Sequence, residues 1–308
     1  MGDPDLCAEI SDLIAEFDPD TLGRLPVRKH EVVERFVAAG NPRAARIVAA
    51  LTDREGVLDP QAVDRLLVRI HCEMQRLSEE FQHGQRVAEL LRPLLAALRQ
   101  AGVSRPIRVI DVGCGTGYVI RWLAAKGNLG EDVELLGADF NAALIEEARR
   151  LAGGEQLRVA FLQANAFRLE EGASVVLSTG VVHHFRGPLL AAFFRGHERA
   201  ETAAFAHFDF QPSPLAPFGS WLFHAARFSE PLAKHDGVVS AVRAHDGQTL
   251  VNAAKAGAPS FQATMYSTRL WFLPIPRSFH ALVGIRPTSR EAFVRALGRR
   301  AGRLGVWR

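Results

Sequence analysis

From Pro106 to Phe210, short β-rich runs alternate with helical patterns, and this alternation limits the folds that the chain can adopt. Strands are expected at 107–112, 133–138, 157–162, 173–178 and 203–210, and helices at 118–126, 142–152 and about 189–197. Strands separated by helices pair in parallel, and right-handed crossovers place helices on both faces of the sheet. The pattern therefore predicts an α/β fold with a doubly wound, mostly parallel sheet.

The regions on either side of this alternation have different patterns. Residues 1–104 read as helical, with an apolar stripe from Val63 to Phe81 at steps of three and four after the N-cap pair Asp59-Pro60. Residues 261–272 and 279–285 read as two antiparallel strands that close the sheet. We therefore predict two domains: a helical N-terminal region or lid at 1–104, and a ligand-binding domain at 105–308.

Composition and charge exclude several classes of protein. The net charge of +3 is too small to indicate nucleic acid as a partner. No apolar run approaches the roughly 18 residues of a membrane span, and the acidic N-terminus is unlike a secretory signal. Three scattered cysteines, Cys7, Cys72 and Cys114, show no metal-ligand spacing. We expect a soluble, cytoplasmic protein without membrane contact, and the sequence leaves a homodimer open.

A glycine-rich turn links the first expected strand to its helix. In Asp111-Val112-Gly113-Cys114-Gly115-Thr116-Gly117, three alternate glycines allow positive φ and close approach of a ligand to the backbone. The dinucleotide fingerprint would place its third glycine one residue later, where this chain has Tyr118. This spacing disfavours a nicotinamide cofactor.

A carboxylate ends the next expected strand, in Gly137-Ala138-Asp139-Phe140-Asn141. Because the carboxyl ends of parallel strands meet at one edge, Asp139 and the glycine turn should flank the same crevice. A carboxylate there can accept hydrogen bonds from both hydroxyls of a ribose. The alternative is that Asp139 only helps to cap the following helix.

Together these segments resemble the first two motifs of class I S-adenosylmethionine-dependent methyltransferases of the small-molecule type. Residues 161–167 (FLQANAF) are similar to the third motif, with Asn165 where an acid is usual. Residues 175–185 (VVLSTGVVHHF) are similar to the fourth strand and its turn. The resemblance implies a seven-stranded Rossmann-like sheet, in which the seventh strand lies between the fifth and sixth.

The resemblance also implies that S-adenosylmethionine (SAM) is the cofactor. It places the glycines beside the amino-acid portion of SAM, Asp139 at the ribose, and Asn165 and Phe167 at the adenine. The residues assigned to the cofactor are Asp111, Gly113, Gly115, Gly117, Asp139, Phe140, Asn165, Ala166, Phe167 and Thr179.

Histidines after the fourth strand are the candidates for a general base. His183 and His184 face the expected crevice, and imidazole titrates near neutral pH. The alternative is that these rings only bind backbone carbonyls of the turn. Further candidates are His83, His207, His224 and His235. No metal is expected, because no pair of histidines has a ligand spacing with a carboxylate.

Two segments outside the sheet are candidates for covering a substrate, residues 75–86 and the insertion at 212–228. His83, Trp221 and Phe223 are the proposed contacts, although aromatic residues suit core packing equally well. We therefore predict methyl transfer to a small molecule, most simply to oxygen by in-line displacement. The alternatives are a protein or RNA acceptor, and a catalytically silent binding subunit with the same fold.

Overall fold

The computed structural model describes residues 8–267 and 279–307. The chain divides into two compact units: Met1–Met74 with Pro212–Ala244 form unit one, and Gln75–Gln211 with His245–Arg308 form unit two. This division differs from the predicted one at residue 104, for two reasons. The helix before residue 104 packs in the core of the sheet, and the 212–244 insertion groups with the N-terminal helices.

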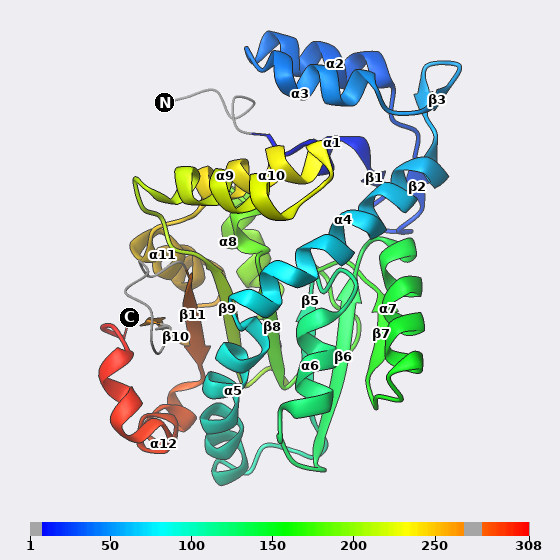
Figure 1. Cartoon of the computed structure of the whole chain (residues 1–308). Coiled ribbons are helices and arrows are strands. Elements are labelled where there is room, and N and C mark those ends of the chain that lie inside the picture. Colours follow the sequence, from blue (N-terminus) through cyan, green and yellow to red (C-terminus); the bar gives the residue numbers. More distant parts are fainter. Residues whose placement is uncertain (1–7, 268–278, 308) are drawn as a thin grey trace. The chain divides into compact units, whose positions relative to one another are not determined.

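Unit two contains a seven-stranded sheet in the order β10-β11-β9-β8-β5-β6-β7 (Figure 1). Its strands are β5 (Ile107–Val112), β6 (Val133–Asp139), β7 (Ala160–Gln163), β8 (Val175–Thr179), β9 (Ala204–Phe210), β10 (Gln262–Ser267) and β11 (Phe279–Ile285). All pairs are parallel except those of β11, which runs antiparallel to β9 and β10. The predicted seven-stranded, mostly parallel Rossmann-like sheet is confirmed, with the seventh strand between the fifth and sixth. The predicted strand at 261–272 lies partly outside the described residues.

Helices cover both faces of this sheet. They are α5 (His83–Gln100), α6 (Tyr118–Lys126), α7 (Ala142–Gly154), α8 (Pro188–Arg195), α11 (Gly247–Gly257) and α12 (Pro287–Leu297), with short 3-10 turns η2 (Val182–His184) and η3 (Gly298–Arg303). Apolar side chains of α5, α6, α7 and α12 form one core with the sheet, and those of α8 and α11 form a second. The sheet is therefore buried between two layers, as its nearly continuous apolar strands require.

Gly84 shows how closely α5 approaches its neighbour. It lies in the first turn of α5, and a Cβ at this position would collide with the indole of Trp122 on α6. Its observed role is to make room for Trp122.

Unit one is mainly helical. It contains α1 (Ile10–Ile14), α2 (Lys29–Ala38), α3 (Pro42–Ala49), α9 (Ala216–Arg227), α10 (Pro231–Arg243), most of α4 (Pro60–Glu80), and the two-residue strands β1 (Glu16–Phe17), β2 (Arg24–Leu25), β3 (Asp53–Arg54) and β4 (Val57–Leu58). The predicted N-cap at Asp59 is confirmed, because its side chain accepts from the N–H of Ala62 at 3.0 Å. Asn41 caps α3 in the same way, accepting from the N–H of Ala44 at 3.0 Å. Helix α10 and the short strands were not predicted.

No helix within residues 8–267 and 279–307 is both long and apolar enough to span a membrane.

Candidate functional site

The glycine turn after β5 has the backbone that its sequence predicts. Gly113, Gly115 and Gly117 have φ of 66°, 55° and 74°, a region that side chains rarely adopt. A Cβ on Gly113 would lie 2.7 Å from Val181, and one on Gly117 would lie 2.5 Å from Phe161. Positive φ and the close packing of Val181 and Phe161 against the turn therefore both require glycine at positions 113 and 117.

Asp139 joins the turn to the next strand. One carboxylate oxygen accepts from the N–H of Gly115 and the other from the N–H of Asn141, both at 2.9 Å. Asn141, not Asp139, caps α7 through its side chain. A carboxylate oxygen has two lone pairs, so Asp139 retains acceptor capacity for a ribose hydroxyl while it holds the turn. Its assignment to the ribose stays a prediction.

Asp111 is a buried acid beside the turn. It is 2% exposed, and its Oδ1 has no hydrogen-bond partner among the described residues. Burial, together with the nearby charge of Asp139, raises the pKa of Asp111 to about 8. A buried acid of this kind is suited to receive a cationic group, which would complete its hydrogen bonding and favour its ionised form. The positive amino group of SAM has this character.

The remaining predicted cofactor residues lie along the same edge of the sheet. Phe140 follows β6 and is 48% exposed. Asn165 follows β7, and its side chain accepts from the N–H of Phe167 at 2.9 Å. The ring of Phe167 packs edge-on against Phe185, at 4.8 Å between centroids. Thr179 ends β8, and its buried Oγ1 has no partner among the described residues. Ala166 lies between Asn165 and Phe167.

His183 forms a buried pair with Asp209. Its Nδ1 lies 2.8 Å from one oxygen of Asp209, and its backbone N–H donates to the other at 3.0 Å. Burial would raise the pKa of Asp209, but the His183 ring and hydrogen bonds, two of them from backbone N–H groups, outweigh it and lower that pKa. With Asp209 ionised, Nδ1 of His183 carries the proton and Nε2 carries the lone pair, which is the form of a general base.

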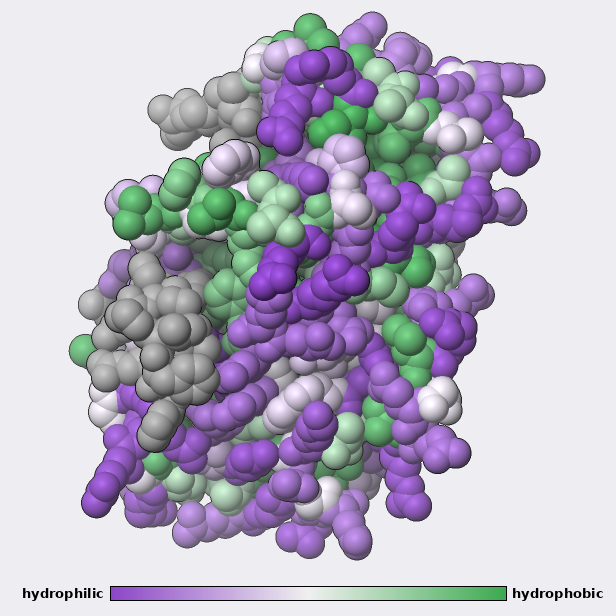
Figure 2. All heavy atoms as spheres, viewed as in Figure 1, coloured by the Kyte–Doolittle hydropathy of each residue, from purple (hydrophilic) through white to green (hydrophobic). Residues whose placement is uncertain are grey.

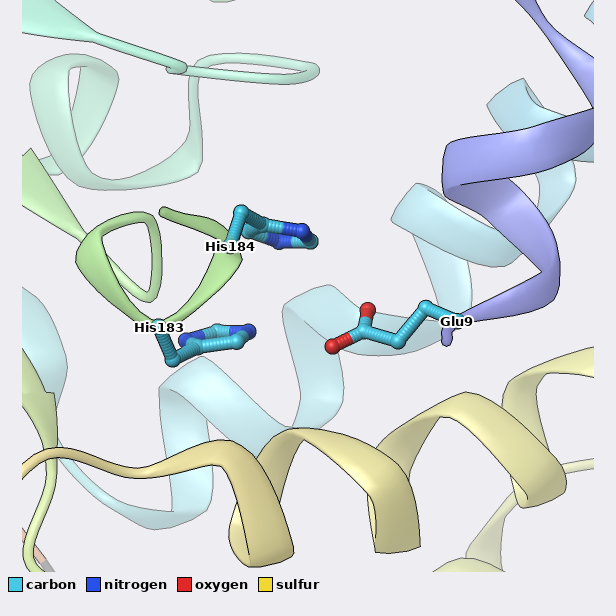
Figure 3. A group of neighbouring side chains, drawn as sticks. All are labelled: Glu9, His183 and His184. Atoms are coloured by element: carbon cyan, nitrogen blue, oxygen red, sulfur yellow. The ribbon is translucent and has the colours of Figure 1, made fainter. Parts of the chain in front are cut away.

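His184 stacks beside His183. The ring centroids are 4.3 Å apart and both rings project to the same side of η2 (Figure 3). Glu9, also labelled there, belongs to unit one, where it accepts from Ser240 at 3.0 Å. The alternative that the His183 ring only binds a backbone carbonyl is wrong, because its Nδ1 pairs with a carboxylate.

Sequence reasoning missed Asp209. It lies at the carboxyl end of β9, as Asp139 lies at the end of β6, so position at a strand end was an available signal. Asp209 was overlooked because it follows His207 in the run His207-Phe208-Asp209-Phe210, and the histidine is the candidate base predicted for this strand.

Two further imidazoles lie near Asp209. His280 on β11 is the register partner of Asp209, and His83 opens α5 with its ring 4.4 Å from that of Phe279. Both are buried; the two ring nitrogens of His83 and Nε2 of His280 have no hydrogen-bond partner among the described residues. Burial lowers the pKa of His83 to about 3 and also lowers that of His280, so both are neutral at pH 7. A neutral imidazole ring can donate a hydrogen bond to a neutral ligand, or accept one from it.

The other predicted histidines have structural partners. His207 lies 2.8 Å from the hydroxyl of Ser178 and 2.9 Å from His197, deep beside α8. His224 and His235 belong to unit one, where they bond to Ser220 and to Asn41 with Asp236, respectively.

Trp221 and Phe223 also belong to unit one, on α9. Trp221 is 47% exposed and stacks on Phe218 at 5.9 Å, and Phe223 packs against Phe228 at 6.3 Å. His83 is thus the one of the three predicted substrate contacts that lies in unit two. The roles of Trp221 and Phe223 at a substrate stay predictions.

Comparisons with known proteins agree with this geometry. Residues 109–200 match a family described as a methyltransferase domain. Trans-aconitate 2-methyltransferase of Pseudomonas paraeruginosa is 33% identical over 94 residues, which are 30% of this chain and 32% of that protein. Demethylmenaquinone methyltransferase of Deinococcus radiodurans is 36% identical over 74 residues, or 24% and 30% of the two chains. The chain thus aligns with about a third of the length of these relatives.

A solved structure extends the likeness in fold. The plantazolicin methyltransferase BpumL, in complex with SAH, matches 73% of this chain and 95% of its own with a TM-score of 0.50 at 11% identity. At this identity the match concerns the fold alone.

Proposed function

Since residues 109–200 carry a methyltransferase domain of the class I, SAM-dependent type, we propose that this chain transfers a methyl group to an oxygen atom of a small molecule. The observation that supports it best is the pairing of His183 with Asp209, at the sheet edge that also holds the glycine turn. The edge thus has a cradle for the cofactor and a base for the acceptor.

The residues present fit SAM. The positive-φ glycine turn after β5 and the unpartnered oxygen of Asp111 suit its amino-acid end. Asp139 would accept hydrogen bonds from the ribose hydroxyls, and Phe140 and Asn165 would flank the adenine. When bound, SAM supplies a methyl group on a positively charged sulfur, which needs little further activation.

The chain's own residues then act on the acceptor. His183 takes the proton of the acceptor hydroxyl on Nε2, and ionised Asp209 holds its ring and stabilises the imidazolium that forms. His83 and His280 contribute neutral hydrogen-bonding groups that orient the acceptor. Orientation in a site that excludes water supplies several kcal/mol of the barrier. The relatives named for trans-aconitate and demethylmenaquinone support an acceptor of small-molecule size.

The test combines binding and turnover on the purified chain. Calorimetry with S-adenosylhomocysteine (SAH) should show binding, and labelled SAM should transfer its methyl group to members of a panel of alcohols and phenols. Transfer to protein or RNA in place of the panel would overturn the small-molecule assignment. SAH binding without transfer to any acceptor class would favour the silent binding subunit.

A further inference from the structure

Unit one contains a cavity that the proposed methyl transfer does not use. It has a volume of about 710 Å³ and lies between α3, α4 and the start of α10. This volume falls in the range of pockets that hold small molecules. Every residue that lines it belongs to unit one.

The floor of this groove is apolar. Val63, Leu66 and Leu232 are buried beneath it, and Ile47 and Leu51 are half-buried at its sides. Figure 2 shows hydrophobic surface bordered by hydrophilic side chains in the region of α3 and α4. An apolar floor of this kind favours a ligand with a hydrocarbon body.

The rim of the groove is positively charged. Arg43 and Arg46 project from α3, three residues apart, and Arg65 and Arg69 from α4, four residues apart, so each pair shares one helix face. Glu230 is the one carboxylate of the lining, and it pairs with Arg69 at 2.6 Å. The lining therefore contains four guanidinium groups and one carboxylate.

Two of these arginines have no partner of their own. The guanidinium groups of Arg43 and Arg65 make no ion pair or hydrogen bond with any described residue, whereas Nε of Arg46 donates to the carbonyl of Pro42. Guanidinium is charged at all physiological pH values and pairs with oxyanions through two parallel hydrogen bonds. The rim thus offers unused donors for an anion directly above an apolar floor.

We propose that this groove binds a carboxylic acid with an apolar body. The carboxylate pairs with Arg43 and Arg65, and the hydrocarbon lies over Val63 and Leu66. Because both parts of the groove are used, neither an inorganic anion nor an uncharged hydrocarbon alcohol should bind it equally well. This site is separate from the proposed methyl-transfer site, so either proposal can fail without the other.

The test is calorimetry on the full-length chain with octanoate, with 1-octanol as its uncharged match and inorganic phosphate as an anion without an apolar body. Octanoate should bind with a Kd below about 1 mM, more tightly than either control ligand, and more weakly as salt is added. Equal binding of octanol, or binding of phosphate as tight as that of octanoate, would overturn the proposal.

Variants locate the site. Arg43→Gln with Arg65→Gln should weaken octanoate binding at least about tenfold, because two charge-assisted contacts are lost. Ala50→Trp, at an exposed position in the lining, should block the groove. Arg76→Gln is the matched control on the same helix outside the lining and should leave binding unchanged. His183→Ala should also leave it unchanged, and loss of octanoate binding in that variant would place the acid at the sheet edge instead.

Folding is checked independently of octanoate. Circular dichroism and SAH affinity should match the parent chain in all the arginine variants, so a loss confined to octanoate reports the groove. Unchanged octanoate binding in both the double arginine variant and Ala50→Trp would exclude this site.

Discussion

Along the edge of the sheet after β5 and β6, the groups offered to a ligand are the backbone of the glycine turn and the carboxylates of Asp111 and Asp139. Beside η2, β9 and β11, the groups offered are side chains alone. The first region, which we call the cofactor half, comes from the contiguous stretch Asp111 to Asp139. The second, the acceptor half, is assembled from His83, His183, Asp209 and His280, far apart in the chain. A cofactor that many enzymes share can be held largely by the shape of the backbone, whereas an acceptor specific to one enzyme requires particular side chains.

If the cofactor half depends on backbone shape, a single methyl group should destroy it. Gly117→Ala combines a φ of 74° with a Cβ 2.5 Å from Phe161. We expect SAH affinity and methyl transfer to fall by more than about a hundredfold, and unfolding free energy by about 2–3 kcal/mol. Calorimetry and thermal unfolding check this.

The control for this change is Gly153→Ala, in α7, where a Cβ meets nothing within 4 Å. It should leave SAH affinity unchanged and stabilise the chain by up to about 1 kcal/mol. Full SAH affinity in Gly117→Ala would show that the turn does not contact the cofactor.

The acceptor half should lose turnover without losing the cofactor. Asp209→Asn keeps the shape but removes the charge that orients His183. We expect methyl transfer to fall by about 10²–10⁴-fold with SAH affinity within twofold of the parent. Adding His183→Ala should cost little more, because the two residues act as a unit. If the loss of methyl transfer in the double variant equals the product of the losses in the two single variants, the two residues do not share a role.

Replacing Asp139 tests whether a side chain contributes to cofactor binding in the cofactor half. Asp139→Ala removes the acceptor for the N–H groups of Gly115 and Asn141. SAH binding should weaken by about 1–3 kcal/mol, while transfer at saturating SAM is largely kept. An unchanged SAH affinity would remove Asp139 from the cofactor site.

The smallest expected effect concerns pH. The pKa of Asp111 is raised to about 8 in the free chain, so at pH 7 it is mostly protonated and must ionise to pair with an ammonium group. SAH affinity should therefore rise about fivefold from pH 7 to pH 8, as the ionised fraction of Asp111 rises from about a tenth to about a half, with proton release at pH 7. Asp111→Asn should abolish this rise, and an affinity independent of pH in the parent chain would contradict it. Calorimetry in buffers of different ionisation enthalpy measures both quantities.

The same contrast explains what the sequence could predict. The glycine turn and Asp139 are local, so strand and helix periodicity places them correctly at one edge. Asp209 and His280 meet only through the register of β9 and β11, and no pattern along the chain reports that pairing. The strands β1 to β4 are too short to show a period of two, and the N-cap residue of α10, Glu230, provides no side-chain cap.

The carboxylate of Asp139 accepts hydrogen bonds from the N–H groups of Gly115 and Asn141, so the chain's own atoms hold the turn. Both amides should therefore exchange slowly with deuterated solvent before SAM arrives. The concave shape of the turn then forms during folding, and little conformational entropy has to be lost there when the donor docks.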